Sequence, residues 1–507
     1  MPDADYEAYD RRTQPAAEPI ADPNLAARLT PASAKKTLVT RDGASLDYTV
    51  TAGYFDLTEE NIGGPLAEDA TVKARVFLTQ YVADEANDNR TANGDNTRPV
   101  IFLFNGGPGS SSAWLHLGLF GPRIVDVVKE DGVTPKRPPY QLRDNPDSPL
   151  AFADLVVVDA ISTGYSRVAT GETADQYHDA DVDVEAMTNI IRLWITRNRR
   201  WNSPLYIAGE SYGVLRGSAV TDRLAIRYGI YLSGLILISS PITLGRMDFA
   251  PGTILGNHAF LPTYAAVAHY HGFNADRTLD DVLAEAEHFA DTDYLWALNQ
   301  GHRLTEDKRR EIIATYSRLT GLDEAFVDRA DLKVTPAQFR AELLRSQSRV
   351  VGRNDGRFIG WDRNGLGETP AGDPADQVLR GAFAAGINSY LRQEVGYEND
   401  LSYEIDTTRV KPWNVPQNHR RNPFHVLPEL SKALRTNRTL RVLYQVGHYD
   451  LCTPFWGMIS DVALLEIPPE LRGNVRVSEF DSGHMIYVDD ASRIRESADI
   501  RRFVTEE

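Results

Sequence analysis

The chain of 507 residues contains one cysteine, Cys452, and few basic residues relative to acidic ones. A single cysteine cannot form an internal disulfide, and a metal site built from paired cysteines is excluded as well. The 54 lysines and arginines against 71 acidic residues give a formal net charge of −17. Because a phosphate-binding surface needs a basic face, neither nucleic acid nor an anionic membrane is expected as a partner. Apolar runs stay short of the roughly 18 residues that a membrane-spanning helix needs.

The N-terminal segment lacks the features of an export signal. Residues 1–7 are acidic and polar, with neither a basic stretch nor an apolar one. Residues 1–34 are rich in Pro, Ala, Asp and Arg and show no periodicity. We therefore expect a flexible N-terminal lead over residues 1–34. The location in the cell stays unknown, with the cytoplasm favoured unless an export signal has been removed.

The apolar pattern that follows predicts an α/β fold. The alternating residues 46–55 predict an antiparallel strand near the start of a sheet, and the continuous apolar run at 99–104 predicts a parallel strand covered on both faces. After the last of several such runs the sequence becomes mainly helical, which is typical of a cap that controls access to a site. We predict a core with a central, mostly parallel sheet in two parts, 35–244 and 410–507, and an inserted helical cap over 245–409.

A glycine-bounded serine follows one of the predicted buried strands. The apolar run 204–208 ends at Gly209-Glu210-Ser211-Tyr212-Gly213, and a helix-compatible stretch begins at Val214. A serine in a sharp turn between strand and helix is held in strained geometry with its hydroxyl exposed, and glycines two before and two after it let strand and helix approach closely. Ser211 is therefore a candidate nucleophile. The alternative is an ordinary glycine-bounded turn.

A serine nucleophile needs a base that takes its proton and a carboxylate that orients the base. In an α/β-hydrolase the chain order is serine, acid, histidine, each in a loop after a strand. Two predicted strands near the C-terminus end in loops that contain Asp450 and His484, which we assign as acid and base. His448 is a weaker candidate for the base, because it precedes the acid in the chain. Asp481 is a weaker candidate for the acid, because it lies three residues before His484 in the same loop.

The loop after the predicted strand 99–104 is rich in glycine. Three glycines and a proline occur between Asn105 and Gly109, a composition that excludes a regular helix or strand. Backbone N–H groups of such a loop, together with the N–H of the residue after the nucleophile, can bind the negative oxygen of an acyl-transfer intermediate. We assign this oxyanion hole to the amides of Gly107 and Tyr212. A plain tight turn is the alternative.

Taken together, these loops resemble those of the serine carboxypeptidase family of α/β-hydrolases, in the segments Asn105-Gly106-Gly107-Pro108-Gly109, Gly209-Glu210-Ser211-Tyr212, Gly447 with Asp450, and Gly483-His484-Met485. The resemblance implies an exopeptidase without metal or cofactor, which removes the C-terminal residue of a peptide through an acyl-enzyme. It also implies that Asn105, Gly106 and Glu210 bind the terminal carboxylate of the substrate.

Glu210 in that role has a consequence for pH. A glutamate that faces a substrate carboxylate shares a proton with it, so we expect a raised pKa for Glu210 and faster peptide cleavage at acidic pH. The alternative role for Glu210 is that of an elbow residue hydrogen-bonded within the core.

The chain also departs from the family pattern. Leu103, Ser110 and Ala160-Ile161 stand where the family usually has tryptophan, cysteine and a Gln-Pro pair, and Leu119 stands where many members have a further carboxylate-binding glutamate. These departures indicate a divergent, bacterial-type branch. The family's preference for particular C-terminal residues of the substrate therefore cannot be transferred to this chain.

The function predicted from the sequence is a serine-type carboxypeptidase whose partner is a peptide with a free C-terminus. An esterase or acyltransferase with the same triad is the alternative among enzymes, and a catalytically silent binding protein is the alternative outside them. The sequence leaves a homodimer open.

Overall fold

The computed structural model describes residues 28–59, 71–84, 97–362, 365, 367–415 and 424–506. Residues 1–27, the larger part of the predicted flexible lead, lie outside the described residues. The end of that predicted lead is ordered, because the first strand starts at Ala32.

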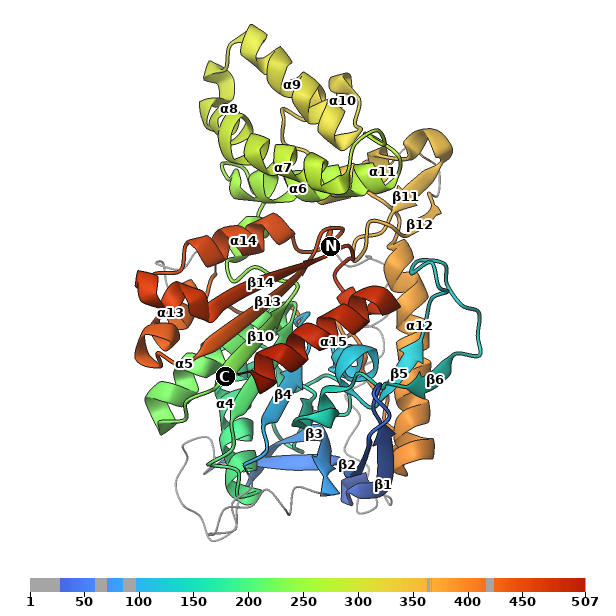
Figure 1. Cartoon of the computed structure of the whole chain (residues 1–507), viewed down its shortest axis with the longest axis vertical. Helices are drawn as coiled ribbons and strands as arrows, with labels where there is room; N and C mark the ends of the chain where they lie inside the picture. The colour runs from blue at the N-terminus through green and yellow to red at the C-terminus, as the bar shows by residue number, and fades with distance from the viewer. Residues whose placement is uncertain are drawn as a thin grey trace.

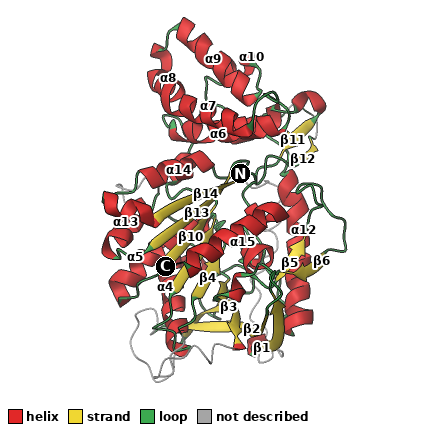
Figure 2. Cartoon of the chain, viewed as in Figure 1, coloured by secondary structure: helices red, strands yellow, loops and turns green. Residues whose placement is uncertain are grey.

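A single large sheet organises the molecule (Figures 1 and 2). Its strand order is β1-β2-β3-β7-β4-β9-β10-β13-β14, with β8 beside β3. The first three strands pair antiparallel, β3 pairs antiparallel with β7, and every later neighbour is parallel. This is the α/β-hydrolase fold that the sequence predicted. The strands are β1 (Ala32–Val39), β2 (Ser45–Thr58), β3 (Val72–Ala83), β4 (Val100–Phe104), β7 (Asp154–Val158), β8 (Arg167–Val168), β9 (Leu205–Glu210), β10 (Gly234–Ile238), β13 (Arg441–Gly447) and β14 (Val475–Phe480).

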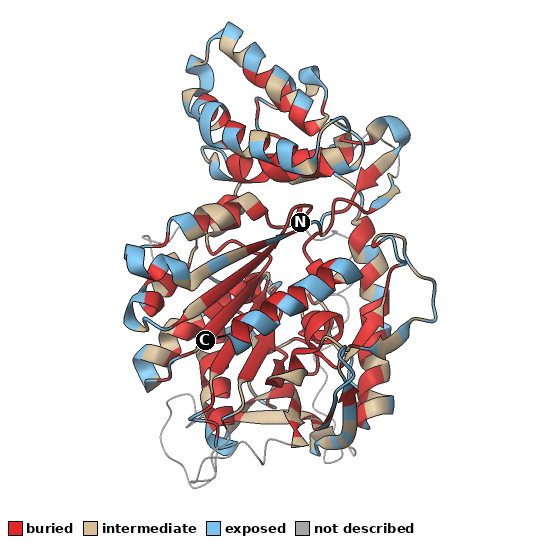
Figure 3. Ribbon diagram, viewed as in Figure 1, coloured by how far each residue is buried: buried red, intermediate tan, exposed pale blue. Residues whose placement is uncertain are grey.

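Both faces of the parallel strands are covered by helices, which explains their continuous apolar sequences. In β4, Phe102 and Phe104 join one core cluster, whereas Ile101 and Leu103 join the cluster on the opposite face. The central strands β4, β7, β9 and β10 are accordingly buried along their whole length, whereas β1 and β14 at the two edges are only partly buried (Figure 3). One face is covered by α4 (Ala180–Arg197), α5 (Tyr212–Tyr228), α13 (Leu427–Thr436) and α14 (Phe455–Ala463), and the other by α3 (Ala113–Leu115), α12 (Pro374–Ser389) and α15 (Asp490–Thr505).

The segment predicted as a cap, 245–409, has two parts. Its first part forms the lobe at the top of Figure 1. Its second part contains α12, whose Leu379 and Phe383 join the core cluster under the sheet. The lobe consists of α6 (Leu255–Tyr270), α7 (Leu279–Phe289), η7 (Ala290–Tyr294), α8 (Leu295–Gln300), α9 (Glu306–Thr320), α10 (Glu324–Arg329), α11 (Pro336–Glu342) and the hairpin of β11 (Arg349–Val351) and β12 (Ile359–Trp361).

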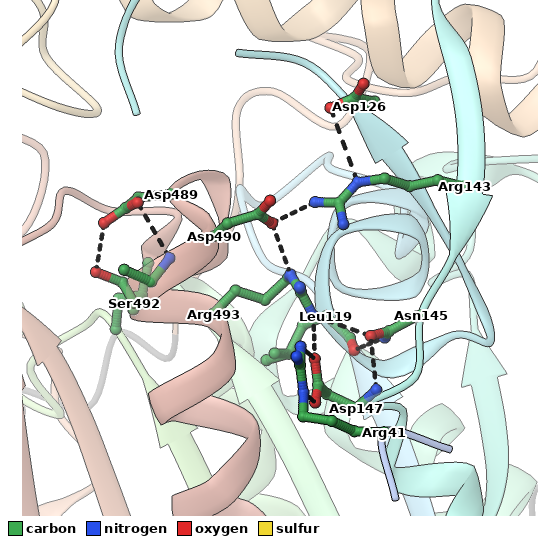
Figure 4. A network of polar contacts seen from close by, with 12 residues as sticks. Arg41, Leu119, Asp126, Arg143, Asn145, Asp147, Asp489, Asp490, Ser492 and Arg493 are labelled. Atoms are coloured by element: carbon green, nitrogen blue, oxygen red, sulfur yellow. Dashed lines mark hydrogen bonds and ion pairs between the residues drawn. The ribbon is translucent and has the colours of Figure 1, made fainter. Parts of the chain in front are cut away.

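The C-terminal helix is fixed to the core by a buried arginine. Arg493 of α15 donates hydrogen bonds to Asn145 Oδ1 at 2.9 Å and Asp147 Oδ2 at 3.1 Å, and Arg41 also pairs with Asp147 (Figure 4). Asn145 in turn donates to the carbonyl of Leu119. The polar groups join α15 to the hairpin of β5 (Arg123–Asp126) and β6 (Gln141–Asp144) and to the short helix η3 (His116–Phe120).

The remaining short helices are η4 (Pro149–Ala151), η5 (Ala174–Tyr177), η6 (Leu244–Met247), η8 (Gly301–Arg303), η9 (Arg345–Gln347), η10 (Tyr390–Val395), η11 (Pro469–Asn474) and η12 (Ile486–Val488).

Candidate active site

Ser211 lies in a strained turn between β9 and α5. Its φ of 59° and ψ of −130° are values that a side chain other than glycine adopts only when the surroundings impose them. The flanking glycines allow this geometry, since a Cβ atom on Gly209 would lie 2.2 Å from the carbonyl oxygen of Gly213. A Cβ atom on Gly213 would lie 2.7 Å from the carbonyl oxygen of Phe104. The half-buried Ser211 side chain is thus presented at the end of the strand.

Asp450 and His484 form a buried pair. His484 Nδ1 donates to Asp450 Oδ2 at 2.7 Å, and the two side chains are 9% and 0% exposed. The other carboxylate oxygen of Asp450 accepts the N–H groups of Cys452 and Thr453 at 2.8 and 2.9 Å. Burial lowers the pKa of His484, but the charge and hydrogen bond of Asp450 outweigh it, so this pKa lies above its usual value.

The weaker candidates pair with each other instead. His448 Nδ1 lies 3.0 Å from Asp481 Oδ1, and His448 Nε2 lies 3.1 Å from Glu479 Oε2. Although burial acts against the charged ring, these two carboxylates raise the pKa of His448 to about 9. Both ring nitrogens of His448 are therefore engaged by carboxylates, and Asp481 is engaged by His448.

The end of β10 connects the serine turn with the Asp450–His484 pair. The Ser211 N–H donates to the carbonyl of Ile238 at 2.9 Å, and the Thr453 hydroxyl lies 2.9 Å from the carbonyl oxygen of the next residue, Ser239. The Thr453 hydroxyl is also 2.6 Å from Asp450 Oδ2 and 3.0 Å from His484 Nδ1. The three predicted residues thus come from adjacent loops, although no hydrogen bond joins the Ser211 hydroxyl to His484 within the described residues. Such bonds are often long before a substrate binds.

The glycine-rich loop lies directly over the start of α5. A Cβ atom on Gly106 would be 2.2 Å from the backbone nitrogen of Tyr212, so only glycine allows this approach. Gly107 is exposed with φ +101°, and Tyr212 is the first residue of its helix. The first N–H groups of a helix have no partner inside it. Among the described residues neither the Gly107 amide nor the Tyr212 amide donates a hydrogen bond, so both remain available to an oxyanion.

Asn105 and Glu210 are joined beside the serine turn. Asn105 Nδ2 donates to Glu210 Oε1 at 2.8 Å, and Asn105 Oδ1 accepts the N–H of Leu115 at 3.0 Å. Glu210 Oε2 is buried and has no hydrogen-bond partner in the part of the chain that the structure describes. Burial raises the pKa of Glu210 to about 7, with a further contribution from Asp450 that His484, Tyr487 and Asn105 oppose. A carboxylic acid with this pKa is protonated at mildly acidic pH and can donate a hydrogen bond to an anion.

Residues 81–224, which contain both the glycine-rich loop and the serine turn, match the family described as serine carboxypeptidase. Over this part, the chain is similar to serine carboxypeptidases. It is 26% identical over 222 residues to serine carboxypeptidase ctsa-3.1 of Caenorhabditis elegans, which covers 42% of this chain and 34% of the relative. It is 27% identical over 164 residues to serine carboxypeptidase S10 family member 1 of Dictyostelium discoideum, covering 32% of each. The chain thus spans about a third of the length of the curated relatives that it matches. The bacterial-type branch stays a prediction.

Solved structures that align with the chain include a proline iminopeptidase of Mycobacterium smegmatis, with 12% identity, a TM-score of 0.34 and coverage of 93% of this chain and 98% of that one. Another is the peroxisomal alpha-beta-hydrolase Lpx1 of Saccharomyces cerevisiae, with 10% identity, a TM-score of 0.36 and coverage of 91% and 90%. The fold assignment rests on the strand order and pairing given above.

The departures from the serine carboxypeptidase pattern are visible in this structure. Leu119, which the resemblance places where many family members have a carboxylate-binding glutamate, is fully buried in the core cluster and offers only an apolar side chain. Asn105 and Glu210 are 2% and 3% exposed. The polar groups expected to meet a terminal carboxylate are therefore fewer than in the family pattern and lie below the surface.

Two residues around this site were not predicted from the sequence. Thr453 could have been suspected as the polar residue three positions after Asp450. Asn354, whose carbonyl accepts the His484 N–H at 2.6 Å, carries no sequence signal, because it lies in the helical insertion far from any motif.

Among the described residues, one group of side chains is close enough to share a metal ion. It consists of Asp450, Cys452 and His484, whose ligand atoms lie within 4.8 Å of one another. Two of these three residues are the acid and base assigned above. In the described part of the chain, no helix has the length and apolar character needed to cross a membrane.

Proposed function

We propose that the chain is a serine-type carboxypeptidase in which Ser211 is the nucleophile, His484 the general base and Asp450 the residue that orients it. The observation that carries the proposal is the buried hydrogen bond between His484 and Asp450, next to a strained serine turn in a chain similar to serine carboxypeptidases over residues 81–224. The family match and the fold support the broader class, a hydrolase.

In this mechanism His484 takes the proton of the Ser211 hydroxyl while the oxygen attacks the last peptide carbonyl. Asp450 accepts from Nδ1, which leaves Nε2 as the basic nitrogen and stabilises the imidazolium that forms. The amides of Gly107 and Tyr212 bind the oxyanion of the tetrahedral intermediate. His484 then protonates the leaving amine, and water hydrolyses the acyl-enzyme by the same steps.

The terminal carboxylate of the substrate is proposed to meet Glu210, with Asn105 and Gly106 beside it. Protonated Glu210 would donate a hydrogen bond through Oε2, the oxygen that has no partner among the described residues. Ionised Glu210 would repel the carboxylate. The proposed substrate is therefore a peptide with a free C-terminus, cleaved faster below the pKa of Glu210.

The test is digestion of a peptide mixture, in free-acid and amidated forms, at a mildly acidic and a neutral pH, followed by mass spectrometry. Stepwise loss of C-terminal residues from free-acid peptides alone is expected, faster at the lower pH. The variant Ser211→Ala should keep its circular dichroism spectrum and lose nearly all turnover. Turnover that survives in this variant would exclude Ser211 as the nucleophile.

An esterase or acyltransferase is the second candidate, and the burial of Asn105 and Glu210 together with Leu119 is the observation that favours it. A site with few accessible carboxylate-binding groups suits a substrate without a terminal carboxylate. Rapid hydrolysis of a simple p-nitrophenyl ester without cleavage of any peptide would select this function, with the same triad.

A further inference from the structure

The turn between β11 and β12 contacts the loop that carries His484. The Asn354 carbonyl accepts the His484 N–H at 2.6 Å, and a Cβ atom on Gly483 would lie 2.4 Å from that same carbonyl oxygen. The helical insertion thus reaches the base by way of residues 352–358. Asn354 is thus in direct backbone contact with the base, and Arg353 is the residue before it.

The backbone of this turn is held from a second side. The N–H groups of Arg353 and Asn354 donate to the two oxygens of Asp373 at 2.8 and 3.3 Å. Asp373 is also the N-cap of α12, where it accepts the N–H of Ala375 at 3.1 Å. Arg353 is therefore anchored between the base loop and a core helix, so its side chain starts from a fixed position.

The Arg353 side chain itself is free. It is exposed, and its guanidinium forms neither an ion pair nor a hydrogen bond with the residues that the structure describes. Two other arginines of the insertion differ in this respect. Arg340 bonds the carbonyl of Val351 at 3.0 Å, and Arg357 pairs with Asp355 at 2.7 Å.

The positive charge of Arg353 nevertheless interacts with charged groups of the active site. Cys452 is the largest of the influences that raise the pKa of Arg353, followed among the acidic groups by Asp373 and Asp450. In return, the positive charge of Arg353 opposes the effect of Asp450 on the pKa of His484. The exposed guanidinium of Arg353 is therefore close enough to Asp450 and His484 for its charge to act on both residues.

We propose that Arg353 binds a carboxylate of the substrate next to the scissile bond, and so makes the enzyme prefer peptides with an acidic residue at the last or second-last position. A guanidinium without a protein partner offers two parallel N–H groups to a carboxylate, the strongest type of hydrogen bond between side chains. This inference rests on the proposed carboxypeptidase function, in which Glu210 takes the terminal carboxylate. The terminal carboxylate is the other possible source of the same group.

The experiment compares kcat/KM for matched peptides that carry Glu or Gln at the last two positions, in wild type and in Arg353→Gln. Wild type should prefer the Glu peptides, and the variant should lose about tenfold or more on these alone, as expected for a charged hydrogen bond. Equal loss on Glu and Gln peptides, with an unchanged neutral p-nitrophenyl ester, would identify the terminal carboxylate as the bound group. Equal loss on the neutral ester, or no change on any substrate, would overturn the proposal.

Arg349→Gln is the matched control, because Arg349 lies at the other end of the same hairpin, with its guanidinium 3.4 Å from the centre of the Trp361 ring. It should leave the Glu-to-Gln preference unchanged, and thermal melts should show that both variants are folded. If wild type cleaves no peptide, the proposed function fails, and the hemisuccinate and butyrate esters of p-nitrophenol then test Arg353 separately. A hemisuccinate preference lost in Arg353→Gln would support carboxylate binding, and an unchanged ratio would overturn it.

Discussion

At the scale of single residues, Glu210 has two possible tasks that the same carboxyl group can perform. It can stabilise the turn through its hydrogen bond with Asn105, or it can donate a hydrogen bond to a substrate through Oε2 when it is protonated. Because the pKa of Glu210 is about 7, the two roles can be told apart by their pH dependence. Only the second role depends on the protonation of Glu210 in the pH range where the enzyme would act.

The first prediction concerns Glu210→Gln. In wild type, kcat/KM for free-acid peptides should fall as pH rises through about 7, because the protonated donor is lost. An amide donates at every pH, so the variant should show a flatter profile on its alkaline side. Pre-steady-state or steady-state assays between pH 5 and 9 would measure it. The matched ester substrate should give similar alkaline limbs in both enzymes, and an unchanged peptide profile would leave Glu210 with the structural task alone.

The second prediction concerns Asp450→Asn. The amide cannot hold His484 in the tautomer with a proton on Nδ1, so kcat should fall on the order of 10⁴-fold. His448→Gln is the control, since His448 is bonded to Glu479 and Asp481. It should keep kcat within about tenfold. Comparable losses in the two variants would argue against the assignment of acid and base.

At the scale of elements, the turn between β11 and β12 is expected to set the position of the base loop. Arg357 forms a buried ion pair with Asp355 at 2.7 Å and donates to the Asp481 carbonyl at 3.0 Å and to the Ser482 hydroxyl at 3.1 Å. The arginine therefore joins the insertion to the loop that ends at His484. The Arg357 and Asp355 side chains are 7% and 6% exposed, so water cannot replace either partner beside the other when one of them is removed.

The third prediction follows from this pair. Arg357→Met should lower the free energy of unfolding by about 3 kcal/mol, because Asp355 is left buried without its partner. It should also lower kcat, since the loop that carries His484 loses two hydrogen bonds. The double variant Asp355→Asn/Arg357→Met should regain part of the stability but not of kcat. Urea unfolding and ester hydrolysis measure the two effects, and full recovery of kcat would show that the pair acts on stability alone.

The fourth prediction concerns the pH dependence of stability near β13 and β14. The pKa of His448 is raised from about 6.5 to about 9 in the folded state, so its ion pairs stabilise the protein fully below pH 6.5. This contribution should disappear as pH rises through about 9. Denaturation midpoints of wild type should fall over this window, and those of His448→Gln should fall less. Parallel curves would mean that Glu479 and Asp481, which are largely exposed, hold the ring too weakly.

Some helices and strands could be predicted from the sequence, and others could not. β4 and β9 were predictable because a strand covered on both faces reads as a continuous apolar run. The helix α6 was not assigned from its sequence, since residues 256–268 are buried on every side and show no amphipathic period. The triad loops carried local motifs. The contact between Asn354 and His484 joins residues 130 positions apart, so only the fold could reveal it.

At the scale of the whole molecule, the helical lobe and the sheet share one apolar core. Phe260 and Leu261 of α6 belong to the same buried cluster as Phe455 of α14 and Val442 of β13. The first helix of the insertion, α6, is therefore part of the hydrophobic core that it shares with the sheet. The outer helices α8 to α10 are largely exposed on their far side (Figure 3).

The fifth prediction is that α6 unfolds together with the sheet and not with the outer helices of the insertion. Amide hydrogen exchange, followed by mass spectrometry of peptic fragments, should give α6 protection close to that of β13 and α5, because exposing α6 also exposes the shared cluster. Helices α8 to α10 should exchange earlier, since their loss exposes less of it. Protection of α6 that matches α9 instead of β13 would contradict this view and would make the insertion a separate folding unit. Active-site closure by the whole lobe would then be favoured over movement of its outer helices.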